Sequence, residues 1–203
     1  MDGDDPRPVT RRSLLASLLA VGGSLLARPA VGQFSLLDRM RPASARAAPW
    51  DDRFEVAITF DVTTPAGGRR PYVVVFVESL DGKPVRTVGM WIQRGRRSWI
   101  RQLRHWFRLE RDRQVAGGEG DLADTISSPT RRAGTYTMVW DGRSDSGDPV
   151  ELGTYAIGIE AVRELGTYQL IRREFTFDAT PFAEDLEGNP EIGGARIEYR
   201  ERA

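Results

Sequence analysis

The chain is poor in residues that form covalent cross-links or soft-metal sites. Its 203 residues include no cysteine, and His105 is the only histidine. Disulfides and attachment of a lipid to cysteine are therefore excluded, and a zinc or haem site lacks the ligands that usually complete it. Stability must come from the core alone, and the roughly 150 residues that follow Trp50 are enough for one domain with a core.

An excess of charge of either sign is also missing. The 29 basic and 29 acidic residues balance to a formal net charge of zero, which gives no general attraction to nucleic acid. Lys83 is the only lysine, so arginine supplies nearly all of the positive charge. The number of arginines therefore carries little information, whereas their placement does.

A hydrophobic segment of membrane-spanning length is absent as well. The apolar run Ser13–Ala27 is shorter than the ~20 residues that a spanning helix requires. It directly follows the pair Arg11-Arg12 and contains glycine, which is the pattern of a twin-arginine export signal. The sequence thus predicts that the twin-arginine translocase exports the folded chain to the periplasm or another extracytoplasmic location, with no stable membrane span after cleavage.

The remaining residues divide into a linker and a domain. The predicted signal covers residues 1–32, with cleavage after Gly32 or as late as residue 47, because small residues precede both positions. Residues 33–52 form the predicted flexible linker. Alternation with a period of two begins at Phe54, and we expect a single domain over residues 53–200.

Short strands separated by turn residues dominate this domain. Apolar residues alternate from Phe54 to Phe60, and the β-branched run Pro71–Ser79 predicts a central strand. Further strands are expected at Val85–Ile92, Gly134–Trp140, Thr154–Glu164 and Thr167–Asp178, with an edge strand at Ala195–Arg200. The pattern predicts an all-β fold, an immunoglobulin-like β-sandwich of about seven to eight strands.

One segment changes to a helical period. Trp99, Leu103, Trp106 and Phe107 follow the spacing of one helix face, which predicts an inserted amphipathic helix over Ser98–Leu109. The complementary face carries a basic stripe of Arg97, Arg101, Arg104, Arg108 and Arg111. Such a stripe either contacts an anion or an acidic partner or is a solvated face.

Two resemblances follow from these residues. The segment from Trp140 to Gly147, followed by Pro149-Val150 and Gly153-Thr154-Tyr155, resembles a signature of the immunoglobulin-like module of the flagellar hook-capping protein. In that reading Trp140 caps the core and the Asp/Gly loop turns the chain into the next strand. This resemblance implies a fold and says little about function.

The longer resemblance is to the predicted periplasmic family catalogued as domain of unknown function 2271, and it extends from about Phe54 to Asp178. It is carried by Trp91, the Trp99–Phe107 segment, Asp124–Thr130, the Trp140 turn and Glu160–Leu170. Family members often have histidine where this chain has Leu165. The resemblance implies a setting beside membrane flavoproteins of the PepSY type and FAD:protein FMN transferases, hence an extracytoplasmic redox or metal-uptake system.

The segment Asp124–Thr130 resembles the motif at which such a transferase esterifies a hydroxyl with FMN. Asp124, Ser127 and Thr130 match the motif, and Thr130 would carry the flavin. Ser128 and Pro129 replace its small residues, and proline removes a backbone N–H and fixes φ. A polar turn capped by Asp124 and Ser127 explains the same residues without a cofactor.

Other polar residues suggest weaker sites. Asp141, Asp145 and Asp148 share one turn, but their spacing is not that of an EF-hand calcium loop. Glu160 and Glu164 lie on one face of a strand, where pairing with Arg163 or Arg172 is the simplest expectation.

Three functions stay open at this level. The first is a non-catalytic accessory or binding protein of a flavin- or PepSY-type redox system, docking through the arginine helix or a sheet edge. The second is an electron carrier with FMN on Thr130, and the third is a stand-alone periplasmic ligand-binding module. No catalytic motif accompanies His105.

Overall fold

The computed structural model describes residues 47–64, 68–93 and 97–202. The chain divides into the units Met1–Ser44 and Ala45–Ala203, and everything described below belongs to the second. The predicted signal with Arg11 and Arg12, and most of the predicted linker, lie outside the described residues. Within the part that the structure describes, no helix is long and apolar enough to cross a membrane.

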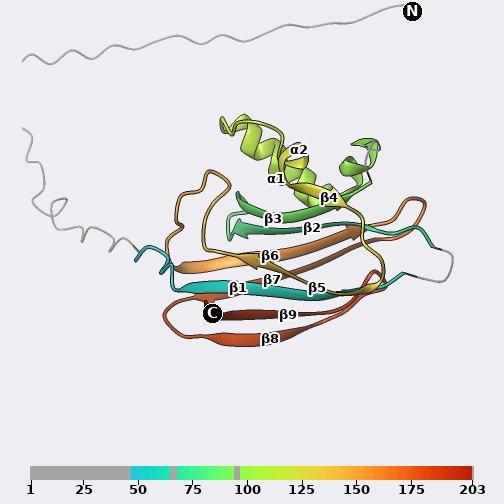
Figure 1. The fold of residues 1–203 in the computed structure, drawn as a ribbon. Coiled ribbons are helices and arrows are strands. Elements are labelled where there is room, and N and C mark those ends of the chain that lie inside the picture. Colours follow the sequence, from blue (N-terminus) through green and yellow to red (C-terminus); the bar gives the residue numbers. More distant parts are fainter. Residues whose placement is uncertain (1–46, 65–67, 94–96, 203) are drawn as a thin grey trace, which may run out of the picture. The chain divides into compact units, whose positions relative to one another are not determined.

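The domain is built from two β-sheets and a helical layer (Figure 1). The strands are β1 (Phe54–Val62), β2 (Tyr72–Ser79), β3 (Pro84–Ile92), β4 (Ser127–Pro129), β5 (Gly134–Trp140), β6 (Gly153–Val162), β7 (Tyr168–Phe177), β8 (Phe182–Glu187) and β9 (Ile192–Glu201). The helices are η2 (Arg97–Gln102, 3₁₀), α1 (Arg104–Val115) and α2 (Leu122–Ile126). One sheet has the order β5-β1-β9-β8 and the other β4-β3-β2-β6-β7. The predicted all-β sandwich with a helical insertion is thus confirmed.

The expected edge strand at Ala195–Arg200 is a central strand instead. It belongs to β9, which pairs with β1 on one side and with β8 on the other. Strand β8 was not predicted, because its alternation places the acidic residues Asp185 and Glu187 on its exposed face. Charged residues on an edge strand are a common protection against pairing with another chain.

The main core lies between the sheets. Val56, Ile58 and Phe60 of β1 face residues of β2 such as Val73 and Val75, and all of them are buried. This is the side-chain alternation that the sequence pattern predicts. The expected capping role of Trp140 is also observed, since only 1% of this residue is exposed and its ring packs against Tyr155 and Phe177.

The predicted linker is too long at its C-terminal end. Pro49 forms a β-bridge with Glu151, and Trp50 is buried with its ring centroid 4.8 Å from that of Trp140. The Trp50 Nε1 donates a hydrogen bond to the Phe54 carbonyl at 3.1 Å. Residues 49 and 50 therefore belong to the domain, because burial of an indole with its N–H satisfied is strongly favourable.

A second core lies between the five-stranded sheet and the helices. Tyr72, Val74 and Phe76 point away from the first core and pack with Leu103 and Trp106. Strand β2 is consequently buried on both faces, which explains its uninterrupted apolar sequence. The helices lie over β3 and β2 in Figure 1.

The predicted helix over Ser98–Leu109 is two helices with a break at Leu103. This residue has φ −75° and ψ 73° and its side chain is fully buried. The two Glu160 carboxylate oxygens accept hydrogen bonds from the backbone N–H groups of His105 and Trp106, at 2.9 and 2.8 Å. A carboxylate at this position satisfies N–H groups of the first turn and favours a new helix start there.

Candidate functional site

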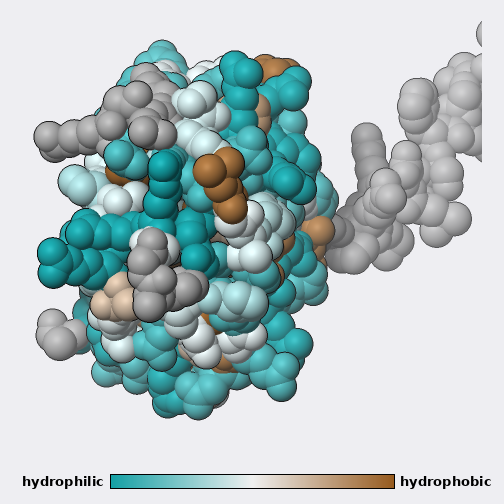
Figure 2. Space-filling model, turned by 90° about the vertical axis from the view of Figure 1, so that its right-hand side faces the viewer, coloured by the Kyte–Doolittle hydropathy of each residue, from teal (hydrophilic) through white to brown (hydrophobic). Residues whose placement is uncertain are grey.

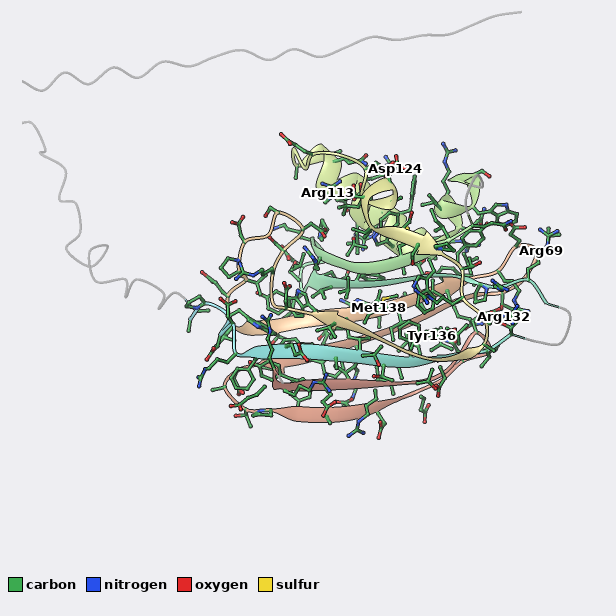
Figure 3. All side chains as sticks on the ribbon, in the orientation of Figure 1. Arg69, Arg113, Asp124, Arg132, Tyr136 and Met138 are labelled. Carbon is green, nitrogen blue, oxygen red and sulfur yellow. The ribbon has the colours of Figure 1, made fainter. Side chains whose placement is uncertain are left out.

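The candidate site is an open pocket at one end of the sandwich. It has a volume of about 520 Å³ and is lined by Gly68, Arg69, Arg70, Gln93, Thr130 and Glu164. These residues come from four separate connections: the one before β2, the end of β3, the end of β4 and the β6–β7 turn. Figure 3 labels Arg69 and Arg132 at this end. The volume falls in the range of ordinary small-molecule sites.

Glu164 anchors one wall of the pocket. Its side chain is 1% exposed and pairs with the guanidinium of Arg69, which is 56% exposed. The Tyr72 hydroxyl donates a hydrogen bond to Glu164 Oε1 at 2.8 Å. Because Tyr72 is buried in the second core, the carboxylate is fixed to the sheet and in turn holds Arg69 at the mouth.

Arg70 supplies a less constrained positive charge. It is exposed, and its Nη1 lies 3.4 Å from the backbone carbonyl oxygen of Thr130. No carboxylate of residues 47–64, 68–93 and 97–202 forms an ion pair with it. Both side chains end in guanidinium groups, which carry donors and no acceptor, so the pocket presents hydrogen-bond donors to an anion.

The chain after Thr130 is held against the four-stranded sheet. The Arg131 guanidinium lies over the rings of Trp91 and Tyr136, at 5.5 and 5.8 Å from their centroids. The Tyr136 hydroxyl donates to the Arg132 carbonyl at 3.0 Å. These contacts fix the crossing from β4 to β5, at which Figure 3 labels Arg132 and Tyr136.

The residues of the expected FMN motif are not gathered at this pocket. Thr130 lines it, whereas Asp124 is exposed on α2 and Ser127 begins β4. Strand β4 pairs in parallel with β3, and an extended chain places Thr130 about 10 Å beyond Ser127. Attachment of a flavin at Thr130 stays a prediction.

The predicted arginine stripe is divided by contacts within the protein. Arg104 lies over the Tyr168 ring at 5.1 Å, and Arg108 is 3.4 Å from Asp112 and 3.7 Å from Glu78. Arg101 and Arg111 line a separate groove of about 240 Å³ beside α1. Nothing is described for the Arg97 side chain. A partner contact by this stripe is therefore still a prediction.

Titratable groups beside the second core form hydrogen bonds that hold α1 to the sheet. Glu78 accepts hydrogen bonds from Arg172 and from His105 Nε2, the latter at 2.8 Å. Burial alone raises the pKa of Glu78, but these two hydrogen bonds outweigh it and hold the pKa below its ordinary value. His105 also stacks on Phe76 at 5.2 Å, so it is part of the packing between α1 and the sheet.

Glu160 and Glu164 do not pair with Arg163 or Arg172 as expected. Arg163 pairs with Glu191 at 2.5 Å and Arg172 pairs with Glu78, whereas Glu160 caps α1. Burial raises the pKa of the Glu160 carboxyl, and the two N–H bonds offset only part of this effect. The sequence did not indicate these pairings because each joins distant segments.

The aspartates of the turn after Trp140 accept hydrogen bonds from other residues of the protein. Asp145 Oδ1 accepts from the Thr87 backbone N–H at 2.8 Å, and Asp148 accepts from the Ser146 hydroxyl at 2.9 Å. Within the described ranges no group of three or more His, Asp or Glu side chains is arranged to hold a metal ion. This turn ties β5 to β3.

Arg69, Arg70 and Gln93 were not predicted as site residues. The only signal was local: an arginine pair follows a Gly-rich turn, and a second pair follows Thr130. In a chain with this many arginines, neither pair stands out. Their common location becomes visible only when β2, β3 and β4 are placed side by side.

Fold and pocket together define a class of protein, an all-β sandwich with a helical cover on one sheet and an arginine-lined pocket at one end. The family model described as predicted periplasmic protein (DUF2271) matches residues 53–194, and the chain belongs to this family. Searches of curated proteins and of solved structures found no match. The likeness of the Trp140 turn to the hook-capping module stays a resemblance.

Proposed function

We propose that this protein is an exported, non-catalytic accessory or binding protein of an extracytoplasmic flavin- or PepSY-type redox or metal-uptake system. It engages an anionic group of its partner or ligand through the pocket of Arg69, Arg70 and Thr130. The family's periplasmic description supports the location, and the setting that the family resemblance implies supports the system.

The observation that carries this proposal is the lining of the pocket. The residues that line it include two arginines, a glutamine and a threonine, and guanidinium groups bind anions instead of exchanging protons. The Glu164 carboxylate, which also lines the pocket, is engaged by Arg69 and Tyr72. Outside the pocket, Glu78, Glu160 and His105 hold α1 against the sheet. An arginine-lined pocket whose neighbouring acidic and basic groups are held by structural contacts favours binding over catalysis.

Complex formation with a membrane partner tests the proposal. The exported mature protein is mixed with the detergent-solubilised PepSY-type or flavin-carrying membrane protein of the same host and followed by size-exclusion chromatography. We expect a complex that the double variant Arg69→Gln/Arg70→Gln weakens about tenfold or more, because charged hydrogen bonds are lost. Arg173→Gln removes one positive charge from β7, outside the pocket, and serves as a charge control.

The alternatives give different results in this experiment. Failure to form a complex with any such membrane protein would refute the accessory role. Small-anion binding without a membrane partner would instead identify a stand-alone periplasmic binding module.

A second candidate function is electron transfer by FMN esterified to Thr130. The observation in its favour is that Thr130 lines the same pocket as two arginines, which fit the phosphate of such an ester. Against it, Asp124 and Ser127 lie elsewhere, and Pro129 occupies the last position of β4. When bound, FMN would supply one- and two-electron redox chemistry, and Arg69 and Arg70 would hold its phosphate.

The intact mass of the exported protein tests this candidate. A mass one FMN phosphoester above the polypeptide, lost in Thr130→Ala and kept in Ser127→Ala, would establish the electron carrier. The bare polypeptide mass from a host that contains the transferase would exclude it.

A further inference from the structure

We propose that the pocket is a site for organic phosphate esters, in which Arg70 and Thr130 contact the phosphate directly and Glu164 positions Arg69 as the third ligand. This rests on the proposed binding function and specifies the chemical class of the ligand. The phosphate is either that of a soluble ester or that of a lipid headgroup, since both present the same oxygens.

The donor set favours phosphate over carboxylate. Arg69, Arg70, Gln93 and Thr130 approach the pocket from three connections of the chain. A planar carboxylate has two oxygens and is satisfied by one guanidinium, whereas a tetrahedral phosphate accepts hydrogen bonds from several directions. Donors that come from three connections of the chain therefore match the tetrahedral anion better.

The site is partly organised without its ligand. The Tyr72 hydroxyl holds the buried Glu164 carboxylate, and this carboxylate holds Arg69 by an ion pair. One edge of the Arg69 guanidinium is engaged in this way, and five N–H donors leave others for an anion. Restricting a long arginine before binding lowers the entropy lost on binding.

Charge at the site matches a phosphate ester. Arg69 and Glu164 form an ion pair, whereas among the described residues Arg70 has a 3.4 Å contact with the Thr130 carbonyl oxygen and no carboxylate partner. Among the described residues that line the pocket, Arg70 carries the charge that no carboxylate pairs with, and we expect it to be the main electrostatic determinant. Loss of its charge should therefore have the largest effect of any single change.

The size of the pocket and its rim favour an ester with an organic group. A volume of about 520 Å³ exceeds what an inorganic phosphate fills. Leu165 follows Glu164 directly, is 90% exposed and has φ +57°, a conformation that residues with a side chain rarely adopt. Figure 2 shows this end of the domain as a mostly hydrophilic surface with scattered hydrophobic residues. An apolar group beside the phosphate would cover the Leu165 side chain.

Calorimetric titration of the exported mature protein with phenyl phosphate, phthalate and inorganic phosphate tests the proposal. Phthalate carries the same double negative charge on planar carboxylates. We expect phenyl phosphate to bind about tenfold or more tightly than either of the others. Arg70→Gln should weaken its binding about tenfold, Arg70→Lys should weaken it less, and Arg173→Gln should leave it unchanged.

A second arm separates the two sources of phosphate. Sedimentation with vesicles of phosphatidylcholine and phosphatidic acid, lost in Arg70→Gln, would identify a lipid headgroup, and binding of phenyl phosphate alone would identify a soluble ester. Equal affinity for phenyl phosphate and phthalate, or equal effects of Arg70→Gln and Arg173→Gln, would overturn the proposal. Thermal melting of each variant checks that it is folded. If the protein does not bind phenyl phosphate but still forms the complex with the membrane protein, the phosphate-ester site is refuted and the proposed accessory function is not.

Discussion

Replacing Gly142 by alanine should destabilise the domain through a clash with Trp50. Gly142 has φ +73°, and an added Cβ would overlap the Trp50 indole. The left-handed conformation alone costs alanine about 1 kcal/mol. Overpacking a core adds about 1–3 kcal/mol, so we expect a total loss of about 3 kcal/mol.

The indole cannot move aside without further loss. Its ring centroid is 4.8 Å from that of Trp140 and 5.4 Å from those of Phe177 and Tyr199. Its Nε1 donates to the Phe54 carbonyl. Rotation of Trp50 would break this hydrogen bond and open a cavity, so the overlap has to be relieved by displacement of the turn.

Gly147→Ala is the matched control. Gly147 has φ +89°, and within the described residues no heavy atom lies within 4 Å of an added Cβ. This variant carries the conformational cost without the clash and should lose about 1 kcal/mol. The difference of about 2 kcal/mol between the two variants corresponds to a thermal unfolding midpoint that is about 4–8 °C lower for Gly142→Ala in a domain of this size.

Urea unfolding followed by circular dichroism measures both variants. Equal losses for Gly142→Ala and Gly147→Ala would refute the packing of Trp50 under this turn. A double-mutant cycle gives a second check. In a Trp50→Ala background, Gly142→Ala should cost only about 1 kcal/mol, because the overlapping indole is gone.

Three further predictions concern other parts of the chain. Trp140→Ala should lower the free energy of unfolding by about 3–5 kcal/mol as a large-to-small core change, and an unchanged melting temperature would contradict its burial. Glu78 has a depressed pKa, so its contribution is present above the ordinary value of about 4.3 and is lost as the pH falls through the lower folded-state value. Accordingly, the stability difference between wild type and Glu78→Gln should shrink from pH 7 to pH 3 in denaturant titrations. The double substitution Arg11→Lys/Arg12→Lys should abolish export in a fractionation assay, and export at the normal level would disprove the signal assignment.

Several elements were predictable because their cause is local. Alternation from Phe54 to Phe60 and the β-branched run Pro71–Ser79 depend on neighbouring residues, and strands β1 and β2 occur there as expected. The β6–β7 hairpin around Leu165 is a similar case. Strand β8 was not predicted because its sequence resembles an exposed acidic loop. Its pairing with β9 is seen only in the folded structure.

The helix boundary shows where local reasoning stops. Trp99, Leu103 and Trp106 share one apolar face, so the spacing predicts a single helix across Leu103. The break depends on the Glu160 carboxylate, which reaches the N–H groups of His105 and Trp106 from a strand that comes over 50 residues later. A sequence period contains no information about such a contact.

By itself, the sequence determined the sandwich class, the doubly buried strand β2 and the burial of Trp140, since periodicity and apolar runs encode which faces are covered. The tertiary structure decided the inclusion of Trp50, the start of α1 and the pocket. Arg69, Arg70, Gln93, Thr130 and Glu164 are spread over about 100 residues of the chain. They meet only because strand pairing brings four connections to the same end of the domain, and that long-range pairing is a property of the folded chain.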